Sequence, residues 1–236
     1  MQIVIIAGGL ATRLQPISLQ IPKSMIDIAG KPFLQYQIEL LKKHGIKDIV
    51  LCVGYLSEQI ESYFGSGKNF GVNIQYSYEK DQLLGTGGAL KRAAKLLQDD
   101  FFVMWGDSYL LLDYQDVWNT YKNIKHDALC QTLMVVYKNN NQGDKSNALV
   151  QDNKVILYDK WSNRSDLVYI DNGLSILNKK ILELIPDNQI FALENIFKEL
   201  AFEQKIYAYK TEQKFYEIGS FSGLENFKNF ARENNL

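Results

Sequence analysis

The sequence predicts an α/β fold of the Rossmann-like, three-layer α/β/α type, built on a mostly parallel mixed sheet. In the first half of the chain, short apolar runs typical of buried strands alternate with segments of helical periodicity, which favours a parallel sheet with helices on both faces. Glycine or acidic residues directly follow several of these runs, where ligands bind in this architecture. With 236 residues and no linker, repeat or low-complexity tract, we expect one domain, 1–236.

The first strand, at 2–6, is a short aliphatic run that opens into the glycine pair Gly8-Gly9. Pro32 suits the first turn of a helix over 32–44, whose apolar residues share one face and which ends at Gly45. The segments that follow predict a strand at 49–53, a helix at 57–64, a strand at 72–78, a helix at 88–97 and a strand at 101–105.

From residue 127 the pattern changes to strands of mixed character. We expect strands at 128–137, 147–151, 155–158 and 168–177, with Asp152-Asn153 as the turn of a hairpin. Helices are expected at 179–184 and 193–203, then a strand at 205–209 and a last helix at 224–232. The second half therefore elaborates the same domain.

Composition argues against several classes of protein. The formal net charge is -1 and the Lys and Arg residues are scattered, so no electrostatic footprint for nucleic acid stands out. No apolar stretch reaches the ~20 residues of a membrane span. The N-terminus lacks the features of a secretion signal, so we expect a cytoplasmic protein. Cys52 and Cys130 lie in apolar runs and are expected in the core, and neither His44 nor His126 is expected to be catalytic.

A glycine loop follows the first strand. In Ala7-Gly8-Gly9 the glycines let backbone amides approach a ligand closely, and the cation Arg13 follows at a short distance. Lys23 lies ten residues beyond Arg13 and can fold back over the same group if the intervening segment loops across the sheet edge. Phosphate is the natural ligand of such a set. The alternative is a turn with two solvated cations, which the full spacing disfavours.

The chain resembles the sugar-phosphate nucleotidylyltransferase family, whose signature has the form of Gly8-Gly9-Leu10-Ala11-Thr12-Arg13-Leu14 followed by Ile21-Pro22-Lys23. The resemblance extends to Ser220, and it is strongest to heptose and mannose 1-phosphate guanylyltransferases. It implies that the loop at Ala7, Gly8 and Gly9 binds the triphosphate of an NTP together with Arg13. It also implies that Lys23 neutralises charge around the α-phosphate, so Arg13 and Lys23 are expected to be both nucleotide-binding and catalytic.

A second glycine-rich segment, at 84–89, resembles the base-binding segment of this family, where small residues let the backbone read the edge of a nucleobase. The resemblance implies that Gly85, Thr86 and Gly87 bind the nucleotide. Glu79, just before this segment, is expected to contact the base or ribose, with a solvated charge as the alternative. A helix N-terminus capped by Thr86 is the structural interpretation of the segment, and it is compatible with binding.

Asp107 follows an apolar strand and Gly106, so its carboxylate should project into the same crevice. Mg2+ prefers one or two carboxylates together with phosphate oxygens and water, and the family uses the Gly-Asp at this position in that way. Asp107 is therefore expected to be catalytic and to bind Mg2+, with a turn-forming aspartate as the alternative. In the late motif that supplies the family's second metal carboxylate, Glu217 replaces the usual aspartate, so its direct ligation of the metal is conditional.

Two further segments resemble the sugar-phosphate site of the family. In the first, Asp159-Lys160, the resemblance implies a lysine that holds the phosphate of a sugar 1-phosphate and an acidic residue that bonds sugar hydroxyls, although Trp161 replaces the usual proline. A solvated lysine is the alternative. In the second, Asn172 and Gly173 match the stretch that lines the sugar pocket. The resemblance thus divides the domain into an NTP-binding part at about 1–126, a sugar-phosphate part at about 127–222 and a C-terminal helix at about 223–236.

The implied activity is transfer of an NMP group from an NTP to a sugar 1-phosphate, with Mg2+ as cofactor and an NDP-sugar and pyrophosphate as products. The weak preference is for GTP with a heptose or hexose 1-phosphate. Three alternatives stay open: a uridylyltransferase for an amino-sugar or N-acetylmuramate 1-phosphate, a cytidylyltransferase for a non-sugar phosphate such as phosphocholine, and a non-catalytic nucleotide-sugar-binding protein. No nucleic acid or membrane partner is expected, and the oligomeric state is left open, a homodimer included.

Overall fold

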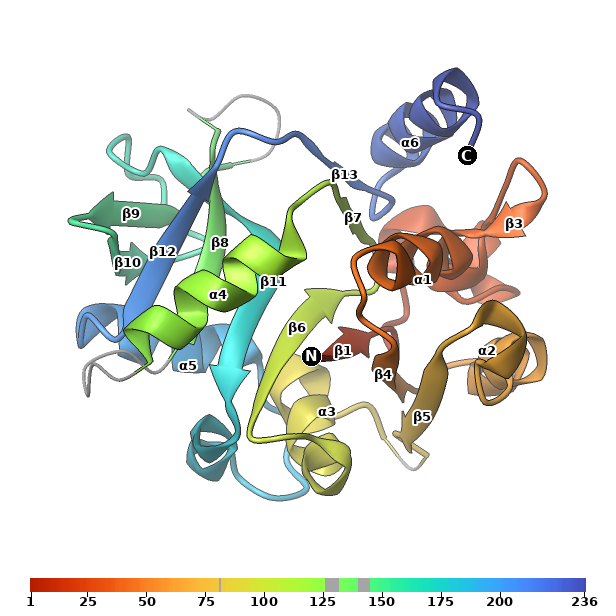
Figure 1. Cartoon of the computed structure of the whole chain (residues 1–236), viewed down its shortest axis with the longest axis horizontal. Coiled ribbons are helices and arrows are strands. Elements are labelled where there is room, and N and C mark those ends of the chain that lie inside the picture. The colour runs from red at the N-terminus through yellow and green to blue at the C-terminus, as the bar shows by residue number, and fades with distance from the viewer. Residues whose placement is uncertain (81, 126–131, 140–144) are drawn as a thin grey trace.

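The computed structural model describes residues 1–80, 82–125, 132–139 and 145–236, and its centre is one twisted nine-stranded sheet (Figure 1). The strands follow one another across the sheet in the order β5 (Asn73–Tyr78), β4 (Asp48–Val53), β1 (Gln2–Ile6), β6 (Asp100–Trp105), β11 (Tyr169–Asn178), β8 (Thr132–Lys138), β12 (Ile206–Thr211), β10 (Lys154–Tyr158) and β9 (Ala148–Gln151).

The strands of the first half run parallel to one another. β1 pairs in parallel with β4 and β6, and β4 with β5, so their carboxyl ends meet at the same edge. β11 then pairs antiparallel with β6 and β8, and β10 antiparallel with β12 and β9. The predicted hairpin turn is confirmed, because Asp152 and Asn153 join β9 to β10 with φ of 47° and 58°. β12 runs parallel to β8, so of the nine strands β10 and β11 run against the other seven, and the sheet is mixed and mostly parallel in strand direction, as predicted.

Helices cover both faces of the sheet (Figure 1). On one face, α3 (Gly85–Ala93) and α5 (Leu193–Phe202) pack on inward side chains such as Val4. On the other, α1 (Phe33–Lys43), α2 (Ser57–Phe64) and α4 (Tyr114–Ile124) pack on its neighbours Ile3 and Ile5. Successive side chains of a strand point to opposite faces, so one aliphatic run can supply both cores. The predicted three-layer α/β/α arrangement is confirmed.

A third apolar cluster joins the last helix, α6 (Phe221–Glu233), to the first half of the chain. The Phe227 ring lies 4.9 Å from Phe33, 5.5 Å from Tyr36 and 4.9 Å from Tyr109, between ring centroids. Next to it, β13 (Phe215–Glu217) pairs with β7 (Ser108–Leu110) in a small antiparallel sheet. This pairing brings the late carboxylate Glu217 beside the Gly106-Asp107 turn. A second small sheet pairs β2 (Asp27–Ile28) with β3 (Lys31–Pro32).

Several predicted elements differ from the structure. The helix expected at 88–97 begins at Gly85, because its glycine-rich first turn is held by the carbonyl of Phe191. Residues Lys179–Leu184 form a 3-10 helix. No range was predicted for α4, although Asp113 caps it by accepting bonds from two backbone N–H groups. Cys52 is buried, as expected, whereas the predictions for Cys130, His126 and the start of the strand at 128–137 fall outside the described residues.

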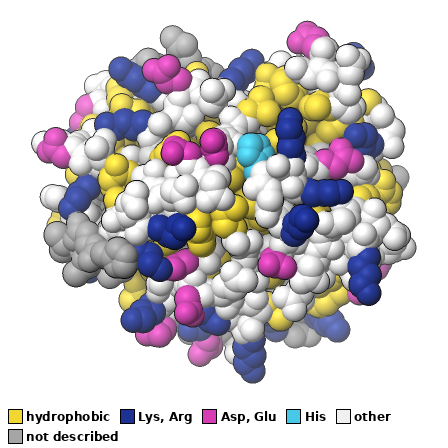
Figure 2. All heavy atoms as spheres, viewed as in Figure 1, with side chains coloured by type: hydrophobic (Ala, Val, Ile, Leu, Met, Phe, Trp, Pro, Cys, Tyr) yellow, Lys and Arg dark blue, Asp and Glu magenta, His cyan; other side chains and the backbone are white. Residues whose placement is uncertain are grey.

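Among the described residues, no helix combines the length and the apolar character that a membrane span needs. On the face shown in Figure 2, side chains of Lys and Arg are interspersed with those of Asp and Glu, and hydrophobic side chains are exposed between them. Charge on this face is therefore mixed.

Candidate active site

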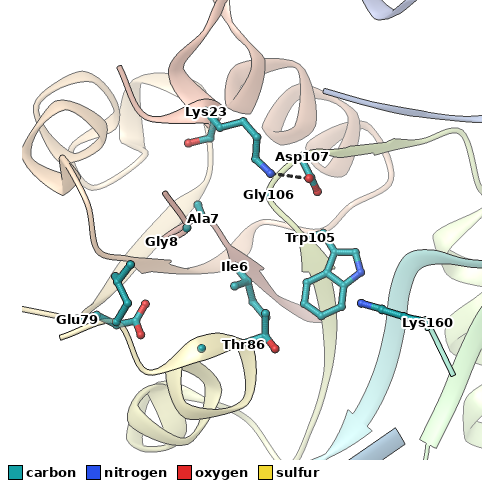
Figure 3. A pocket seen from close by; sticks show the side chains of 14 residues that line it. Ile6, Ala7, Gly8, Lys23, Glu79, Thr86, Trp105, Gly106, Asp107 and Lys160 are labelled. Atoms are coloured by element: carbon teal, nitrogen blue, oxygen red, sulfur yellow. Dashed lines mark hydrogen bonds and ion pairs between the residues drawn. The ribbon is translucent and has the colours of Figure 1, made fainter. Parts of the chain in front are cut away.

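A cavity of about 360 Å³ opens at the carboxyl ends of β1 and β6 (Figure 3). It brings together most of the residues that the sequence predicted for the nucleotide, and also Lys160 from the predicted acceptor set. Its lining consists of Ile6, Ala7, Gly8, Gly9, Lys23, Ser24, Glu79, Leu83, Gly85, Thr86, Trp105, Gly106, Asp107 and Lys160.

The glycine loop forms one wall of the cavity, and its two glycines have different roles. A Cβ atom at Gly8 would lie 2.7 Å from Glu79 Oε2 and 3.1 Å from the backbone nitrogen of Gly54, so a larger residue would force the Glu79 side chain and the neighbouring backbone to shift. A Cβ atom at Gly9 would meet nothing within 4 Å. Gly8 thus fixes the loop against the sheet edge, while Gly9 faces the open side, where a phosphate can approach its backbone.

Lys23 and Asp107 form an ion pair at one side of the cavity, with 2.5 Å between Lys23 Nζ and Asp107 Oδ2 (Figure 3). Their side chains are 23% and 21% exposed, so the pair is partly screened by solvent. Burial raises the pKa of Asp107, but the Lys23 ammonium and, more weakly, the Arg13 guanidinium outweigh burial and hold this pKa below its ordinary value. Asp107 is therefore ionised at neutral pH and can accept a cation.

Arg13 and Glu217 lie beside this pair and outside the lining of the cavity. A Cβ atom at Gly219 would lie 2.8 Å from Glu217 Oε2, 3.1 Å from Arg13 Nη2 and 3.1 Å from Asp107 Oδ2, so the three charged groups converge on this glycine. Glu217 is also engaged by the start of α6, because its two oxygens accept hydrogen bonds from the Gly219 N–H and, at 2.6 Å, from the Ser220 hydroxyl. Its longer side chain is thus bound to the helix terminus.

Glu79 is a buried wall residue of the cavity. Its Oε1 accepts a hydrogen bond of 2.6 Å from the Leu84 N–H, which fixes the chain just before α3. Burial raises the pKa of the Glu79 carboxyl, against smaller lowering effects of the Leu84 N–H and of Arg92. The alternative of a solvated charge is wrong, while the predicted contact with a base or ribose stays a prediction.

The glycine-rich segment at 84–89 packs against the chain before α5. The interpretation of Thr86 as the cap of its own helix is wrong, because Leu84 occupies that position and Thr86 Oγ1 instead accepts a bond of 2.9 Å from the N–H of Leu193 in α5. The Gly87 N–H donates to the Phe191 carbonyl at 2.9 Å, so it is not available to read a base, and Gly87 lies outside the lining. Gly85 and Thr86 remain in the lining.

Of the four predicted acceptor residues, one lines the cavity and three lie outside its lining. Lys160 reaches the lining, with its ammonium 3.9 Å from Glu194 Oε2. Asp159 Oδ1 lies 3.6 Å from the Lys198 ammonium and accepts a bond of 3.0 Å from the Trp161 N–H. The two residues predicted to line the sugar pocket, Asn172 and Gly173, lie in β11 and not in the lining; Asn172 is buried, and its side-chain nitrogen has no hydrogen-bond partner.

A model of the family described as "Nucleotidyl transferase" matches residues 2–233. The chain belongs to this family. The transferase is 32% identical over 222 residues to a D-glycero-alpha-D-manno-heptose 1-phosphate guanylyltransferase of Aneurinibacillus thermoaerophilus, with 93% of each chain covered. It is 31% identical over 210 residues to a UTP--glucose-1-phosphate uridylyltransferase of Synechocystis sp., with 82% of this chain and 53% of that protein covered.

The fold of the transferase is similar to that of HddC from Yersinia pseudotuberculosis, solved as a complex with GMP-PN. The two structures align with a TM-score of 0.82 and 29% sequence identity, covering 97% of this chain and 98% of the other. The suspected family resemblance is therefore confirmed, and with it the assignment of this chain as a transferase enzyme.

Sequence reasoning about the transferase missed two groups at its acceptor side. Trp105, the last residue of β6, lines the cavity with its indole ring (Figure 3). Asp171 in β11 is the second: its carboxylate accepts bonds from the Tyr158 hydroxyl at 3.1 Å and from the Gly173 N–H at 2.9 Å, and burial raises its pKa against the lowering effect of Lys160. The position of Trp105, directly before Gly106-Asp107, was the signal in the sequence that could have identified it.

Proposed function

We propose that this transferase moves a GMP group from GTP to a heptose or hexose 1-phosphate. The coarser reaction, in which an NTP and a sugar 1-phosphate give an NDP-sugar and pyrophosphate, is common to the guanylyl and uridylyl relatives, and this chain is a sugar-1-phosphate nucleotidylyltransferase. The observation that carries the proposal is that one cavity joins the loop at Gly8 and Gly9 and the Lys23–Asp107 pair to the acceptor cation Lys160.

In the proposed reaction an oxygen of the sugar 1-phosphate attacks the α-phosphorus of the NTP. A new P–O bond forms, the bond from the α-phosphorus to the oxygen that bridges to the β-phosphorus breaks, and that oxygen leaves with pyrophosphate. The attacking phosphate is already ionised at pH 7, so no general base is needed. The chain's own contribution is to hold the two phosphates together and to oppose their charge with Lys23, Arg13 and Lys160.

Mg2+ fits the acidic groups of this site. Among the described residues no group of three or more His, Cys, Asp or Glu side chains is placed to hold a metal by itself. A Mg2+ ion that brings phosphate oxygens and water needs only one or two carboxylates, and Asp107 with Glu217 nearby supplies these. In this proposal Asp107 would hold the ion, and Glu217 would contribute through water or after leaving the Gly219 N–H and the Ser220 hydroxyl. When bound, Mg2+ neutralises charge on the phosphate oxygens.

The preference for guanine and for a heptose or hexose rests on two observations. The relative from Aneurinibacillus thermoaerophilus is named for a heptose 1-phosphate and a guanylyl group, and the aligned HddC structure holds GMP-PN. The uridylyltransferase relative keeps UTP as the second candidate. Within this proposal the enzyme acts as one domain in the cytoplasm, on the two small substrates and without nucleic acid.

The decisive experiment is a panel of the four NTPs against heptose, mannose, glucose and N-acetylmuramate 1-phosphates and phosphocholine, with pyrophosphate release as the readout and Mg2+ present. We expect release to be fastest with GTP and a heptose or mannose 1-phosphate. A faster rate with UTP or CTP would overturn the base assignment. Release only with phosphocholine would overturn the sugar assignment, and no release with any pair would favour a non-catalytic nucleotide-sugar-binding protein.

Asp107→Asn should abolish Mg2+-dependent release while the protein stays folded by circular dichroism. The matched control is Asp187→Asn, because the side chain of Asp187 is 80% exposed and lies outside the cavity lining. Wild-type turnover in Asp107→Asn would contradict the site assignment.

A further inference from the structure

Trp105 and Lys160 meet at the acceptor side of the cavity. The Lys160 ammonium lies 5.2 Å from the centroid of the Trp105 ring, within the range of a cation–π interaction. Figure 3 shows the lysine side chain pointing at the indole, on the opposite side of the cavity from Glu79. The two residues come from segments more than fifty positions apart, so the contact depends on the fold.

Trp105 is fixed at its backbone and packed at its ring. The Trp105 carbonyl accepts a hydrogen bond of 3.1 Å from Gln37 Nε2, which anchors the backbone at the end of β6. Gly173, whose φ is 95°, lies against the ring: a Cβ atom there would be 2.6 Å from Trp105 Cδ1 and 2.7 Å from Ser108 Oγ. A side chain at residue 173 would therefore clash with the indole in its present position.

Within the part of the chain that the structure describes, no short ion pair holds the ammonium of Lys160. Its nearest carboxylate oxygen among the described ion pairs, Glu194 Oε2, lies at 3.9 Å, whereas Lys23 Nζ lies 2.5 Å from Asp107. A carboxylate at short range occupies the N–H donors of an ammonium group, but the face of an aromatic ring orients the charge without accepting all three of them. Lys160 thus keeps donors free for an incoming phosphate.

We propose that Trp105 is a positioning residue, whose indole face holds the Lys160 ammonium at the acceptor side of the cavity with its donors directed to the phosphate of the sugar 1-phosphate. The part of this inference that concerns the phosphate rests on the proposed function, whereas the Trp105–Lys160 contact does not. The contact can therefore be measured in the protein without substrates.

The first test uses intrinsic fluorescence. The chain has three tryptophans, so a Trp118→Phe, Trp161→Phe protein reports on Trp105 alone. Lys160→Met should change the intensity and wavelength of this emission without substrates, because it removes a charge from the face of the ring. Lys198→Met, at a lysine whose ammonium pairs with Asp159, is the matched control and should leave the emission unchanged. Unchanged emission in Lys160→Met would overturn the contact.

The second test is a double-mutant cycle on the KM for mannose 1-phosphate. Trp105→Leu should raise this KM about fivefold, equivalent to about 1 kcal/mol of lost cation–π interaction, with kcat and the KM for the NTP within about twofold of wild type. Trp105→Phe keeps an aromatic face and should restore the KM to within about twofold. In a Lys160→Met background, Trp105→Leu should add nothing.

Two results would overturn the positioning role. An equal rise of the acceptor KM in the Lys160→Met background would show that Trp105 acts on the substrate without Lys160. A fall of kcat, or a rise of the KM for the NTP, in Trp105→Leu would show that the substitution disturbs the neighbouring Asp107 instead. If wild type releases no pyrophosphate with any substrate pair, the proposed function fails and the phosphate-directing role fails with it, while the fluorescence test still decides the contact.

Discussion

Lys23→Met should lower turnover and, at the same time, tighten the binding of a divalent cation to the nucleotide-free enzyme. In the structure the Lys23 ammonium occupies Asp107 Oδ2 at 2.5 Å, the oxygen that we expect to bind Mg2+. We therefore expect lysine and metal to compete for one carboxylate until a bound nucleotide offers its phosphates to the ammonium. Methionine removes this competitor and keeps much of the apolar length of the side chain.

The size of the expected change in cation affinity follows from the strength of the Lys23–Asp107 interaction, which depends on how exposed the pair is. Two unit charges about 4 Å apart interact by about 1 kcal/mol in water and by about 4 kcal/mol at an effective dielectric constant of about 20. With side chains 23% and 21% exposed, the pair lies between these limits. We take about 2 kcal/mol, which corresponds to about thirtyfold. Mn2+ affinity should rise by about tenfold to thirtyfold, whereas kcat should fall by about a hundredfold or more, as when one charge-stabilising donor is lost.

The assay is Mn2+ binding by electron paramagnetic resonance without nucleotide, followed by pyrophosphate release with saturating substrates. Lys31→Met is the matched control, because Lys31 forms an exposed ion pair with Glu39 at 3.0 Å outside the cavity lining. It should change neither quantity. Weaker or unchanged Mn2+ binding in Lys23→Met would refute the competition, and undiminished turnover would remove Lys23 from the catalytic set.

Two further predictions concern the packing around the site. Gly8→Ala should lower the melting temperature and raise the KM for the NTP, because the new Cβ would lie 2.7 Å from Glu79 Oε2, at a cost of about 1–3 kcal/mol. Gly9→Ala is the stability control, because a Cβ atom there meets nothing within 4 Å. An equal melting temperature in the two variants would contradict the prediction. Asp100→Asn should destabilise the protein by about 2 kcal/mol at pH 7, measured by urea unfolding. Burial raises the pKa of Asp100, but bonds from Lys125 and other donors outweigh burial and lower it. The stabilisation is therefore present above the unfolded pKa of about 3.9 and is lost as pH falls through the folded value, so the difference between wild type and variant should shrink in acid.

The parts of the fold that the sequence predicts are those fixed by local pattern. An aliphatic run such as 2–6 is buried on both faces and ends in glycines, and this combination identifies the strand and the edge where ligands bind. Gly8 and Asp107 follow two neighbouring parallel strands, so their meeting in one cavity follows from topology alone. The placement of the loop beside Asp107 was predictable for this reason.

The parts that it does not predict depend on contacts between distant segments. Thr86 stands where a helix cap is expected, yet its hydroxyl oxygen accepts a hydrogen bond from the N–H of Leu193, more than a hundred residues away. The sequence predicts that the backbone of Gly87 is available to a nucleobase, but its N–H donates a hydrogen bond to the carbonyl of Phe191. Neither Leu193 nor Phe191 can be identified as a partner from the sequence around residues 84–89. Both hydrogen bonds form only when α5 packs beside α3. A motif match therefore points to a segment without showing which of its backbone groups already have partners elsewhere in the fold, and the predicted nucleotide contacts of this segment stay predictions.

The end of β6 is where the two halves of the site meet. Asp107 faces Lys23 and the glycine loop, and Trp105, only two residues earlier, faces Lys160. Because both residues belong to one strand end, which is paired with β1 on one side and β11 on the other, the spacing between the nucleotide and acceptor groups is set by the sheet and not by a flexible loop. An in-line attack needs both phosphates held at a fixed separation. We therefore expect the sheet to set this separation before either substrate binds, with Asp107 acting on the nucleotide side and Trp105, through Lys160, on the acceptor side.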